Sequence, residues 1–311
     1  MPNIQWNKSY WNNDIQTFNE GESKKVFPNE KYYGDRWGEV EKEPIFKSIK
    51  EKFILPFVNN KSVLEIGPGG GRWTKYLLNC ESLYCVDLNP HSLEYVKNRF
   101  RSQTNITYIL NKGNDFPNIP KKSIDFIFSY GTFVHFDIDV TVDYICNMMD
   151  ILSDNSNVVI QYSEKKVKEG LKDDFLGAEN HSFGSNTAKV MEKIVTDLGF
   201  SIYSEINSIF EWNELGKWVE QNSDSNNSNL IHFGKSDKIN IELEEKDLGD
   251  IVTKAYKSIL NRIPDKKGFE YFTNQLKQKK ITENELKILL VKSEEYKINL
   301  DNLFKKVINS H

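Results

Sequence analysis

The sequence predicts an α/β fold, in which helices cover both faces of a doubly wound and mostly parallel sheet. Three observations support this fold class. From Ser62 onward, short apolar runs alternate with segments of helical periodicity. A glycine-rich turn at 67–71 separates the first apolar run from the first of these helices. The second apolar run ends at the acid Asp87, at the sheet edge where such folds bind ligands.

The first strand is expected at 63–66, and the helix behind the glycine turn at 73–78. Glycine adopts positive φ values and leaves no Cβ between the main chain and a ligand. The free N–H groups at the start of the following helix point to the same place. This strand, turn and helix therefore predict a nucleotide-type binding site.

The glycine spacing argues against a dinucleotide. A dinucleotide fingerprint needs glycine at its first, third and sixth positions, and the sixth position counted from Gly67 is Arg72. Glu65 stands two residues before Gly67, and a carboxylate there suits a cationic ligand better than a pyrophosphate. An NAD-dependent oxidoreductase is therefore the less favoured alternative.

The remaining elements follow in regular order. Asn89 and Pro90 form a helix start, with proline at a plausible first helical position. Asn and Asp tolerate turn conformations, so a turn is expected at 153–157, and a polar loop at 221–229. Further strands are expected at 83–88, 106–110, 123–129 and 157–162, a sixth from 199, and a seventh, antiparallel to the sixth, at 230–233. Further helices are expected at 89–101, 137–152 and 186–198.

These segments resemble the motifs of class I S-adenosylmethionine-dependent methyltransferases over roughly residues 60–235. The pattern Glu65-x-Gly67-x-Gly69-x-Gly71 resembles motif I of that family, in which the acid accepts from the methionine amino group. The resemblance implies a seven-stranded Rossmann-like sheet, S-adenosylmethionine as cofactor and S-adenosylhomocysteine as product. The cofactor-binding residues that it implies are Glu65, Gly67, Pro68, Gly69, Gly71, Asp87, Leu88, Asn114, Asp115, Phe116, Ser129 and Tyr130.

Individual roles follow from the same resemblance. Asp87, twenty residues after Gly67, would accept both ribose hydroxyls. Asp115 would meet the adenine amino group, with Asn114 as its neighbour and Phe116 as a ring contact. The main chain of Ser129 and Tyr130, after the fourth strand, would line the methionine end of the cofactor.

The candidate catalytic residues are histidines. A hydroxyl acceptor must lose a proton during methyl transfer, which calls for a general base within hydrogen-bond reach. Histidine titrates near neutrality, and His135 and His181 follow strands at the ligand-binding edge. We predict His135 as the base or as a residue that orients the acceptor, and His181 as the second candidate. The competing interpretation of His135 is a hydrogen-bonded structural residue.

A metal site is the weaker alternative for the same loop. His135, Asp137 and Asp139 have the side chains that a divalent ion binds. Acids in the first turn of a helix are more simply explained by the helix dipole. No metal is therefore predicted.

The first 60 residues are rich in aromatic side chains, and 44–58 has the pattern of an amphipathic helix. Such a segment resembles the N-terminal cap of many enzymes of this family. Tyr33, Arg36 and Trp37 are predicted to cover the cofactor or the substrate. The alternative is that these three residues only pack the cap onto the sheet.

A helical domain is expected at the C-terminus, with helices at 248–260, 267–278 and 283–296. It resembles a bacterial domain of unknown function that is found in glycan-associated proteins. Its motif Arg262-x-Pro264-Asp265-x-x-Gly268 is a ligand site or, as we favour, only a helix corner. The predicted domains are a cap at 1–60, a methyltransferase domain at 61–235, a linker at 236–246 and the helical domain at 247–311.

Composition limits the possible partners and location. The net charge of −4, with acids and bases interspersed, argues against a nucleic-acid partner. No apolar run reaches the ~18 residues of a membrane helix, and no secretory signal is visible. The three cysteines, which lack metal-binding spacing, fit a reducing cytoplasm.

The function predicted from these features is methylation of a sugar, a glycan or another small hydroxyl-bearing acceptor in bacterial surface-polysaccharide or secondary metabolism. The glycan part rests only on the resemblance of the C-terminal domain, through which a protein or glycan partner is also possible. An N- or C-methyltransferase acting on a metabolite is the alternative, as is a non-catalytic scaffold that binds S-adenosylmethionine.

Overall fold

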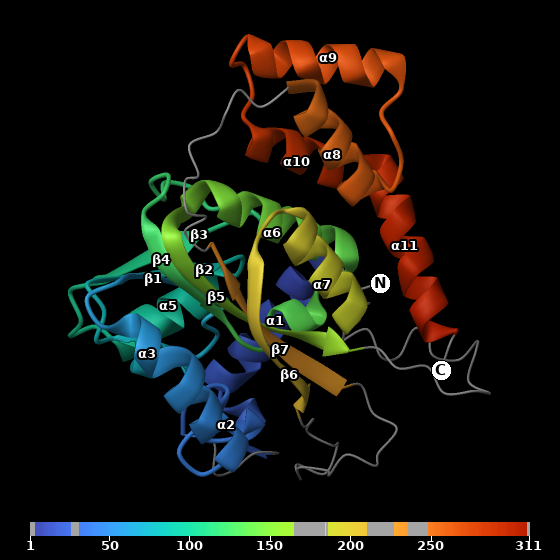
Figure 1. Cartoon of the computed structure of the whole chain (residues 1–311). Coiled ribbons are helices and arrows are strands. Elements are labelled where there is room, and N and C mark those ends of the chain that lie inside the picture. Colours follow the sequence, from blue (N-terminus) through green and yellow to red (C-terminus); the bar gives the residue numbers. More distant parts are fainter. Residues whose placement is uncertain are drawn as a thin grey trace.

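A seven-stranded sheet forms the centre of the computed structural model, which describes residues 4–25, 31–164, 184, 186–209, 227–235 and 248–309 (Figure 1). The strand order is β3-β2-β1-β4-β5-β7-β6. The first five strands in this order are parallel, and β7 is antiparallel to both of its neighbours. The doubly wound fold and its antiparallel last pair are thus confirmed. The strands are β1 (Ser62–Ile66), β2 (Ser82–Asp87), β3 (Ile106–Leu110), β4 (Ile124–Ser129), β5 (Leu152–Glu164), β6 (Ser201–Ile209) and β7 (Asn227–Gly234).

Two apolar layers lie on opposite faces of this sheet. Neighbouring strand residues point to opposite faces, so Val63 and Leu64 of β1 belong to different core clusters. Val63 packs with the N-terminal helices and α5, whereas Leu64 packs with α6 and α7. The helices behind the strands are α4 (Thr74–Leu77), α5 (Pro90–Arg99), α6 (Ile138–Ile151) and α7 (Ala188–Asp197), with a 3-10 turn, η4 (Phe133–His135), after β4.

Two expected connections belong to strands instead. The turn predicted at 153–157 is wrong, because these residues lie within β5. The β4–β5 pairing jumps from Ile124–Leu152 to Phe126–Asn157, so the extra residues form a bulge rather than a separate turn. Residues 227–229, expected at the end of a loop, begin β7 and pair with β5.

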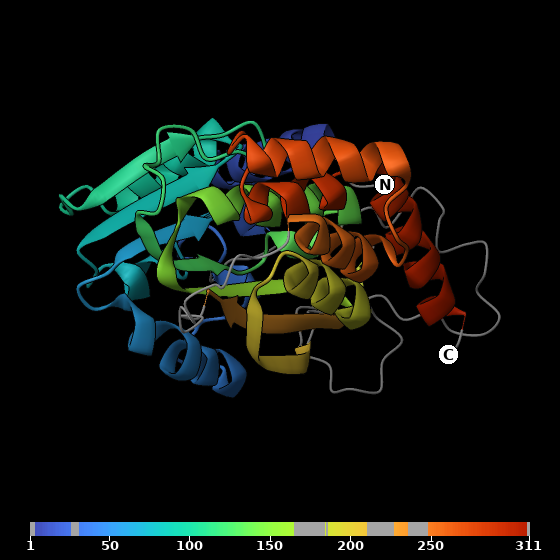
Figure 2. The same ribbon diagram turned by 45° about the horizontal axis from the view of Figure 1, so that its top comes forward.

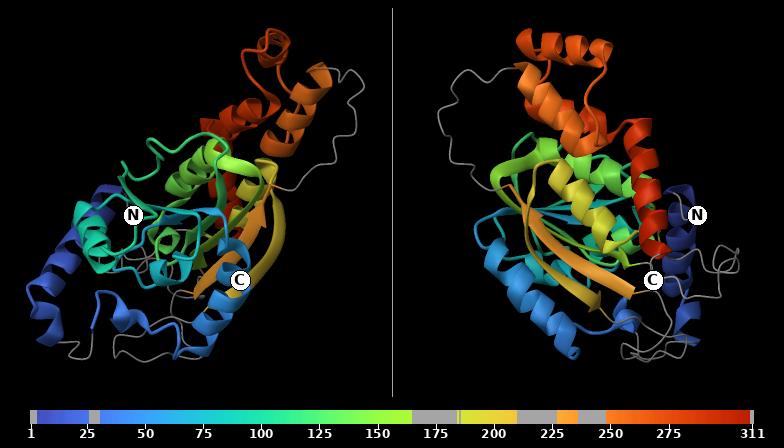
Figure 3. Two further views of the ribbon diagram at one scale, coloured as in Figure 1. Left: turned by 90° about the vertical axis from the view of Figure 1, so that its left-hand side faces the viewer. Right: turned by 45° about the vertical axis from the view of Figure 1, so that its right-hand side comes forward.

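The N-terminal cap consists of one long helix and several short ones beside the sheet (Figure 3). The amphipathic helix predicted at 44–58 forms, but a π-helical turn interrupts it. There the N–H of Leu55 bonds to the carbonyl of Lys50, five residues earlier, just before Pro56, which has no N–H to donate. The cap contains α1 (Ile4–Asn19), η1 (Glu22–Lys25), η2 (Asp35–Trp37), α2 (Pro44–Ile49), the π turn (Lys50–Ile54) and α3 (Leu55–Val58).

Four helices form the C-terminal region: α8 (Leu248–Leu260), α9 (Lys266–Lys277), α10 (Glu283–Val291) and α11 (Glu294–Ile308) (Figure 2). The single helix predicted at 283–296 is wrong. The Oγ of Ser293 accepts from the N–H of Tyr296 at 3.2 Å and caps a new helix. Within the described residues, no helix is both long and apolar enough to cross a membrane.

The motif from Arg262 to Gly268 builds a corner between α8 and α9. The Oδ1 of Asp265 accepts from the N–H of Gly268 at 2.8 Å, which caps α9. A Cβ on Gly268 would lie 2.6 Å from the Oη of Tyr256, so a larger residue there would displace the Tyr256 side chain. Arg262 pairs through two nitrogens with the carboxylate of Glu295, at 2.5 and 2.6 Å. Arg262, Asp265 and Gly268 therefore each have a structural contact, as the helix-corner interpretation requires.

The C-terminal helices share the main hydrophobic core with α7. Tyr296 of α11 is fully buried. Its Oη donates to the Oδ2 of Asp197 at 2.8 Å, and the Nζ of Lys193 reaches the same oxygen at 2.6 Å. Burial raises the pKa of the Asp197 carboxyl, while the bonds from Lys193 and Tyr296 oppose that rise. This contact fixes the C-terminal helices against the sheet domain.

Tyr296→Ala is expected to lower the free energy of unfolding of the whole chain by roughly 3–5 kcal/mol, because it leaves a cavity at the α7–α11 contact. Tyr296→Phe removes only the hydroxyl and should cost about 1 kcal/mol. Urea unfolding, followed by circular dichroism, measures both. Equal stability of Tyr296→Ala and the unmodified chain would contradict a shared core.

Candidate active site

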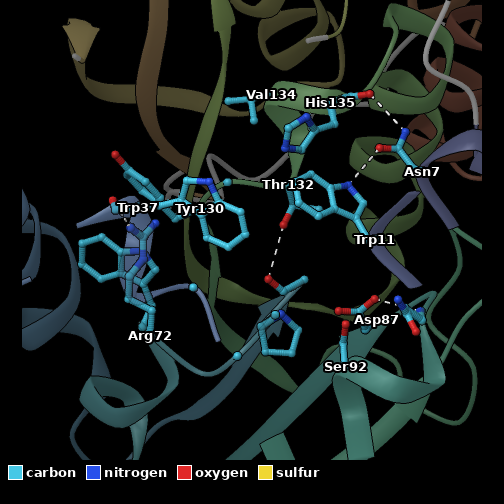
Figure 4. A pocket seen from close by; sticks show the side chains of 18 of the residues that line it. Asn7, Trp11, Trp37, Arg72, Asp87, Ser92, Tyr130, Thr132, Val134 and His135 are labelled. Carbon is cyan, nitrogen blue, oxygen red and sulfur yellow. Dashed lines mark hydrogen bonds between the residues drawn. The ribbon is translucent and has the colours of Figure 1, made fainter. Parts of the chain in front are cut away.

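A cavity of about 570 Å³ lies over the carboxyl ends of the central strands (Figure 4). Its walls come from α1, η2, the glycine turn, the β2–α5 connection, the loop after β4, and the strands β5 and β7. Parallel α/β sheets bind ligands at this edge. The predicted site residues that line the cavity are Gly67, Pro68, Gly69, Asp87, Leu88, Tyr130, His135, Tyr33 and Trp37.

Other predicted residues do not line this cavity. Glu65, Gly71 and Ser129 lie beside or beneath it, and Asn114, Asp115 and Phe116 lie in the loop after β3. His181 falls outside the described residues, as does the side chain of Arg36.

The glycine turn is in close contact with two other segments. Gly67 has a φ of 68°, and a Cβ there would lie 2.0 Å from the Oγ1 of Thr132. A Cβ on Gly70 would lie 1.9 Å from the carbonyl oxygen of Tyr33. The loop after β4 and the N-terminal cap therefore pack closely against the turn from two sides, and only glycine fits at Gly67 and Gly70.

Asp87 ends β2 at the edge of the cavity and is positioned by main-chain donors. The N–H of Asn89 donates to its Oδ1 at 2.8 Å. Burial raises the pKa of the Asp87 carboxyl to about 7, although the N–H groups of Asn89, Leu88 and Gly69 favour the charged form. A carboxylate in this place can accept from a pair of vicinal hydroxyls, as a ribose offers.

Glu65 lies beneath the turn and is 3% exposed. Its Oε2 accepts from the Oγ1 of Thr74 at 2.6 Å. Burial raises the pKa of this carboxyl to about 8, and the charge of Asp87 adds to the rise, against the bond from Thr74. The contact of Glu65 with the methionine amino group remains a prediction.

The loop after β3 satisfies its polar groups internally. The Oδ1 of Asp115 accepts from the N–H of Lys112 at 2.6 Å, and the Nδ2 of Asn114 donates to Asp143 at 3.1 Å. The ring of Phe116 packs on Tyr144, with centroids 5.7 Å apart. The predicted adenine contacts therefore also remain predictions.

The cap covers the cavity with aromatic rings. The Oη of Tyr33 donates to Asp14 of α1 at 2.7 Å, and its N–H donates to the Oη of Tyr95 at 3.0 Å. Trp37 packs edge-on against Tyr33, with ring centroids 5.6 Å apart. Tyr33 and Trp37 thus pack the cap onto the domain and also border the cavity.

His135 is held by α1 in the wall of the cavity. The Nδ2 of Asn7 donates to its carbonyl at 3.2 Å, and its ring lies 4.8 Å from that of Trp11 (Figure 4). The residue is 8% exposed. Within the described part of the chain, no three His, Cys, Asp or Glu side chains lie close enough together to hold a metal ion. This includes His135, Asp137 and Asp139.

Arg72 is a cavity residue to which sequence reasoning gave no role in the site. Its Nη1 donates to the carbonyls of Trp37 at 2.6 Å and Gly38 at 3.3 Å. Its guanidinium carbon lies 5.1 to 5.7 Å from the ring centroids of Phe46, Trp73 and Tyr130. Burial lowers its pKa.

No described carboxylate pairs with Arg72. The buried Nε1 of Trp73 likewise has no acceptor among the described residues. Arg72 is half-buried, and among the described residues carbonyl oxygens and ring faces surround its guanidinium, with no carboxylate. The group formed by Arg72 and its aromatic neighbours therefore suits an anionic ligand.

Gln161 of β5 and Ser228 of β7 also line the cavity and were missed. Both are buried and bonded to each other, the Nε2 of Gln161 donating to the Oγ of Ser228 at 2.8 Å. No motif marks them, because strand pairing alone brings them together.

The residues fit S-adenosylmethionine. The glycine turn has no room for a Cβ on Gly67, and Asp87 offers an acceptor where a ribose would lie. Figure 4 shows Arg72 and Asp87 on opposite sides of the cavity, so an extended nucleoside with a charged amino-acid tail matches both ends.

Comparison with known proteins supports this assignment. Residues 63–155 match the model of a methyltransferase domain, and residues 233–300 match a domain of unknown function, DUF4214. No curated protein matches the chain.

Three methyltransferases are among the solved structures that are similar to this chain. A methyltransferase from Mesorhizobium loti is 15% identical, covers 62% of this chain and 99% of its own, and has a TM-score of 0.48. The N-methyltransferase NodS from Bradyrhizobium japonicum is 17% identical over 62% of this chain and 97% of its own, with a TM-score of 0.44. An Aquifex aeolicus methyltransferase is 16% identical over 63% and 97%, with a TM-score of 0.43.

The matched segment 63–155 runs from β1 into the start of β5, and thus holds the glycine turn, Asp87 and His135. The chain therefore contains a methyltransferase domain over these residues, with S-adenosylmethionine as its cofactor.

Proposed function

We propose that the enzyme methylates a hydroxyl group of a small acceptor, with a sugar or glycan as the acceptor class. The observation that carries the proposal is His135, which lines the cavity beside Trp11. The C-terminal region matches DUF4214, and the glycan association expected from its resemblance supports the acceptor class only by analogy.

When bound, S-adenosylmethionine supplies a methyl group on a positively charged sulfur. His135 takes the proton of the acceptor hydroxyl while the hydroxyl oxygen bonds to the methyl carbon. Transfer of the methyl group would leave the electron pair of the carbon–sulfur bond on sulfur, with S-adenosylhomocysteine as the product. Trp11 and Trp37 line the cavity with apolar ring surface.

The proposal is tested in two steps. Calorimetry with S-adenosylmethionine, S-adenosylhomocysteine and NAD should show binding of the first two only. Radioactive methyl transfer is then screened against nucleotide-sugar and glycan libraries, with amine-bearing metabolites as a second set. Transfer to amines alone would replace the hydroxyl assignment, and His135→Ala with unchanged turnover would remove the proposed base.

Arg72 is proposed to bind the carboxylate of the methionine end of the cofactor. Arg72→Met should therefore weaken S-adenosylmethionine binding by roughly 30- to 100-fold, because a buried charged pair is lost. Arg72→Lys keeps the charge but not the paired N–H donors of the guanidinium, so its affinity for S-adenosylmethionine should fall about tenfold. Calorimetry measures both variants.

The matched ligand for this test is 5′-methylthioadenosine, which has the adenosine but no amino-acid tail. Its affinity should differ by less than about threefold between Arg72→Met and the unmodified enzyme. If both ligands lose affinity equally, Arg72 shapes the cavity but does not bind a carboxylate.

A further inference from the structure

Gln161 has a buried side chain whose amide is bonded at both ends. It is 7% exposed and stands near the carboxyl end of β5, in the wall of the cavity. Its Oε1 accepts from the N–H of Gly131 at 2.8 Å, while its Nε2 donates to Ser228 at 2.8 Å. The main-chain N–H of Gly131 can only donate, so the amide oxygen must face it. The amide is therefore fixed in one orientation.

The bond to Gly131 holds the loop that follows β4. Gly131 has a φ of 77° and stands between two other cavity residues, Tyr130 and Thr132. The Oγ1 of Thr132 lies 3.3 Å from the carbonyl oxygen of Ile66 and 3.4 Å from that of Gly67. The loop thus abuts the glycine turn, and Gln161 holds it from the side of β5.

We propose that Gln161 is a positioning residue for methyl transfer. Its amide holds the Tyr130–Thr132 loop, and through Thr132 the glycine turn, in the arrangement that receives the methionine end of the cofactor. The role rests on the methyltransferase activity of this site but not on the identity of the acceptor. Gln161 is thus bonded to β7 through Ser228, and through the Tyr130–Thr132 loop it is linked to the glycine turn near the centre of the sheet.

The magnitude of the effect follows from the geometry of in-line displacement. A misplacement of about 1 Å in the bound reactant can cost on the order of 100-fold in rate. Without Gln161, the N–H of Gly131 loses its acceptor and the loop is free to shift toward water. Because the loop also lines the cavity, the loss should be measurable as reduced affinity for S-adenosylmethionine, without knowledge of the acceptor.

The test compares three variants. Gln161→Leu removes both bonds and should weaken S-adenosylmethionine binding about tenfold. Gln161→Glu keeps an oxygen for the N–H of Gly131, and the hydroxyl of Ser228 can turn to donate to the second oxygen, so affinity should return to within about threefold. Asn157→Leu is the matched control, since Asn157 also ties β5 to β7, through His232 at 2.9 Å, away from the cavity.

Calorimetry gives the affinities, and thermal unfolding gives the stability of each variant. The amide resonance of Gly131 in nitrogen-15 spectra should move in Gln161→Leu and stay close to its original position in Gln161→Glu. Equal affinity losses in Gln161→Leu and Asn157→Leu would reduce Gln161 to a general strand contact and overturn the proposal, as would unchanged affinity in Gln161→Leu. If the unmodified chain bound no S-adenosylmethionine, the cofactor assignment itself would fail.

Discussion

Gly67→Ala is expected to weaken S-adenosylmethionine binding by at least about 100-fold. Gly67 has a φ of 68°, which alanine adopts only under strain. The new Cβ would also lie 2.0 Å from the Oγ1 and 2.8 Å from the Cγ2 of Thr132. Either the glycine turn or the loop after β4 must move, and both border the cavity. Calorimetry measures the loss.

Two variants separate the steric contact from the strain. Gly21→Ala is the control, because Gly21 has a φ of 79° at the end of α1, with no described atom within 4 Å of its added Cβ. It should leave cofactor affinity unchanged within error. Thr132→Gly combined with Gly67→Ala removes the collision and should recover about tenfold of the lost affinity. Binding by Gly67→Ala at the original affinity would mean that the cofactor rests elsewhere.

The glycine turn and Asp87 could be predicted because their signals are local. Gly67 follows the apolar run of β1 directly, and Asp87 ends the apolar run of β2. Parallel strands bring their carboxyl ends to one edge, so consecutive signals along the chain become neighbours in space. The strand predicted at 106–110 has the bounds of β3 for the same reason.

The other cavity residues depend on contacts between distant parts of the chain. Gln161 meets Ser228 because β5 and β7 pair in antiparallel register. Arg72 has a role only because the cap brings Trp37 and Phe46 to its side. No periodicity in the sequence predicts contacts between residues so far apart in the chain, which explains why both residues were missed.

The error at 283–296 has a different origin. The apolar spacing continues past Lys292, so periodicity alone extends the helix. Ser293 carries the competing local signal, an N-cap hydroxyl that bonds to Tyr296 and begins α11 in a new direction. A capping residue within an apolar repeat therefore marks a helix boundary that periodicity hides.

Glu65→Gln is expected to stabilise the ligand-free protein and to lower its affinity for S-adenosylmethionine. Burial raises the pKa of the Glu65 carboxyl from 4.5 to about 8 in the folded chain. Between these pH values the unfolded chain loses this proton and the folded chain keeps it, so the stability of the unmodified protein falls as the pH rises. Glutamine does not titrate and avoids this fall. The variant should gain up to about 3 kcal/mol at pH 7 and nothing near pH 4.

Urea unfolding of both proteins at pH 4.5, 6 and 7.5 measures the difference in stability, in which the titration of shared groups that do not interact with Glu65 cancels. Thr74→Val is the control, because it removes the hydroxyl that donates to Glu65 but leaves the carboxyl to titrate. It should retain the pH dependence. A gain in Glu65→Gln that did not change with pH would show that the carboxyl is already ionised in the folded chain.

Cofactor binding should respond in the opposite direction. A carboxyl that destabilises the free protein is explained if a cationic ligand needs its charge, since function commonly retains such costly groups. S-adenosylmethionine should therefore bind about tenfold or more weakly to Glu65→Gln at pH 8. In the unmodified enzyme, binding near pH 7 should release a proton from Glu65, which calorimetry in buffers of different ionisation enthalpy detects. A variant that is more stable and binds equally well would leave Glu65 without a role at the cofactor, whereas a more stable but weaker binder would place its charge beside the sulfonium ligand.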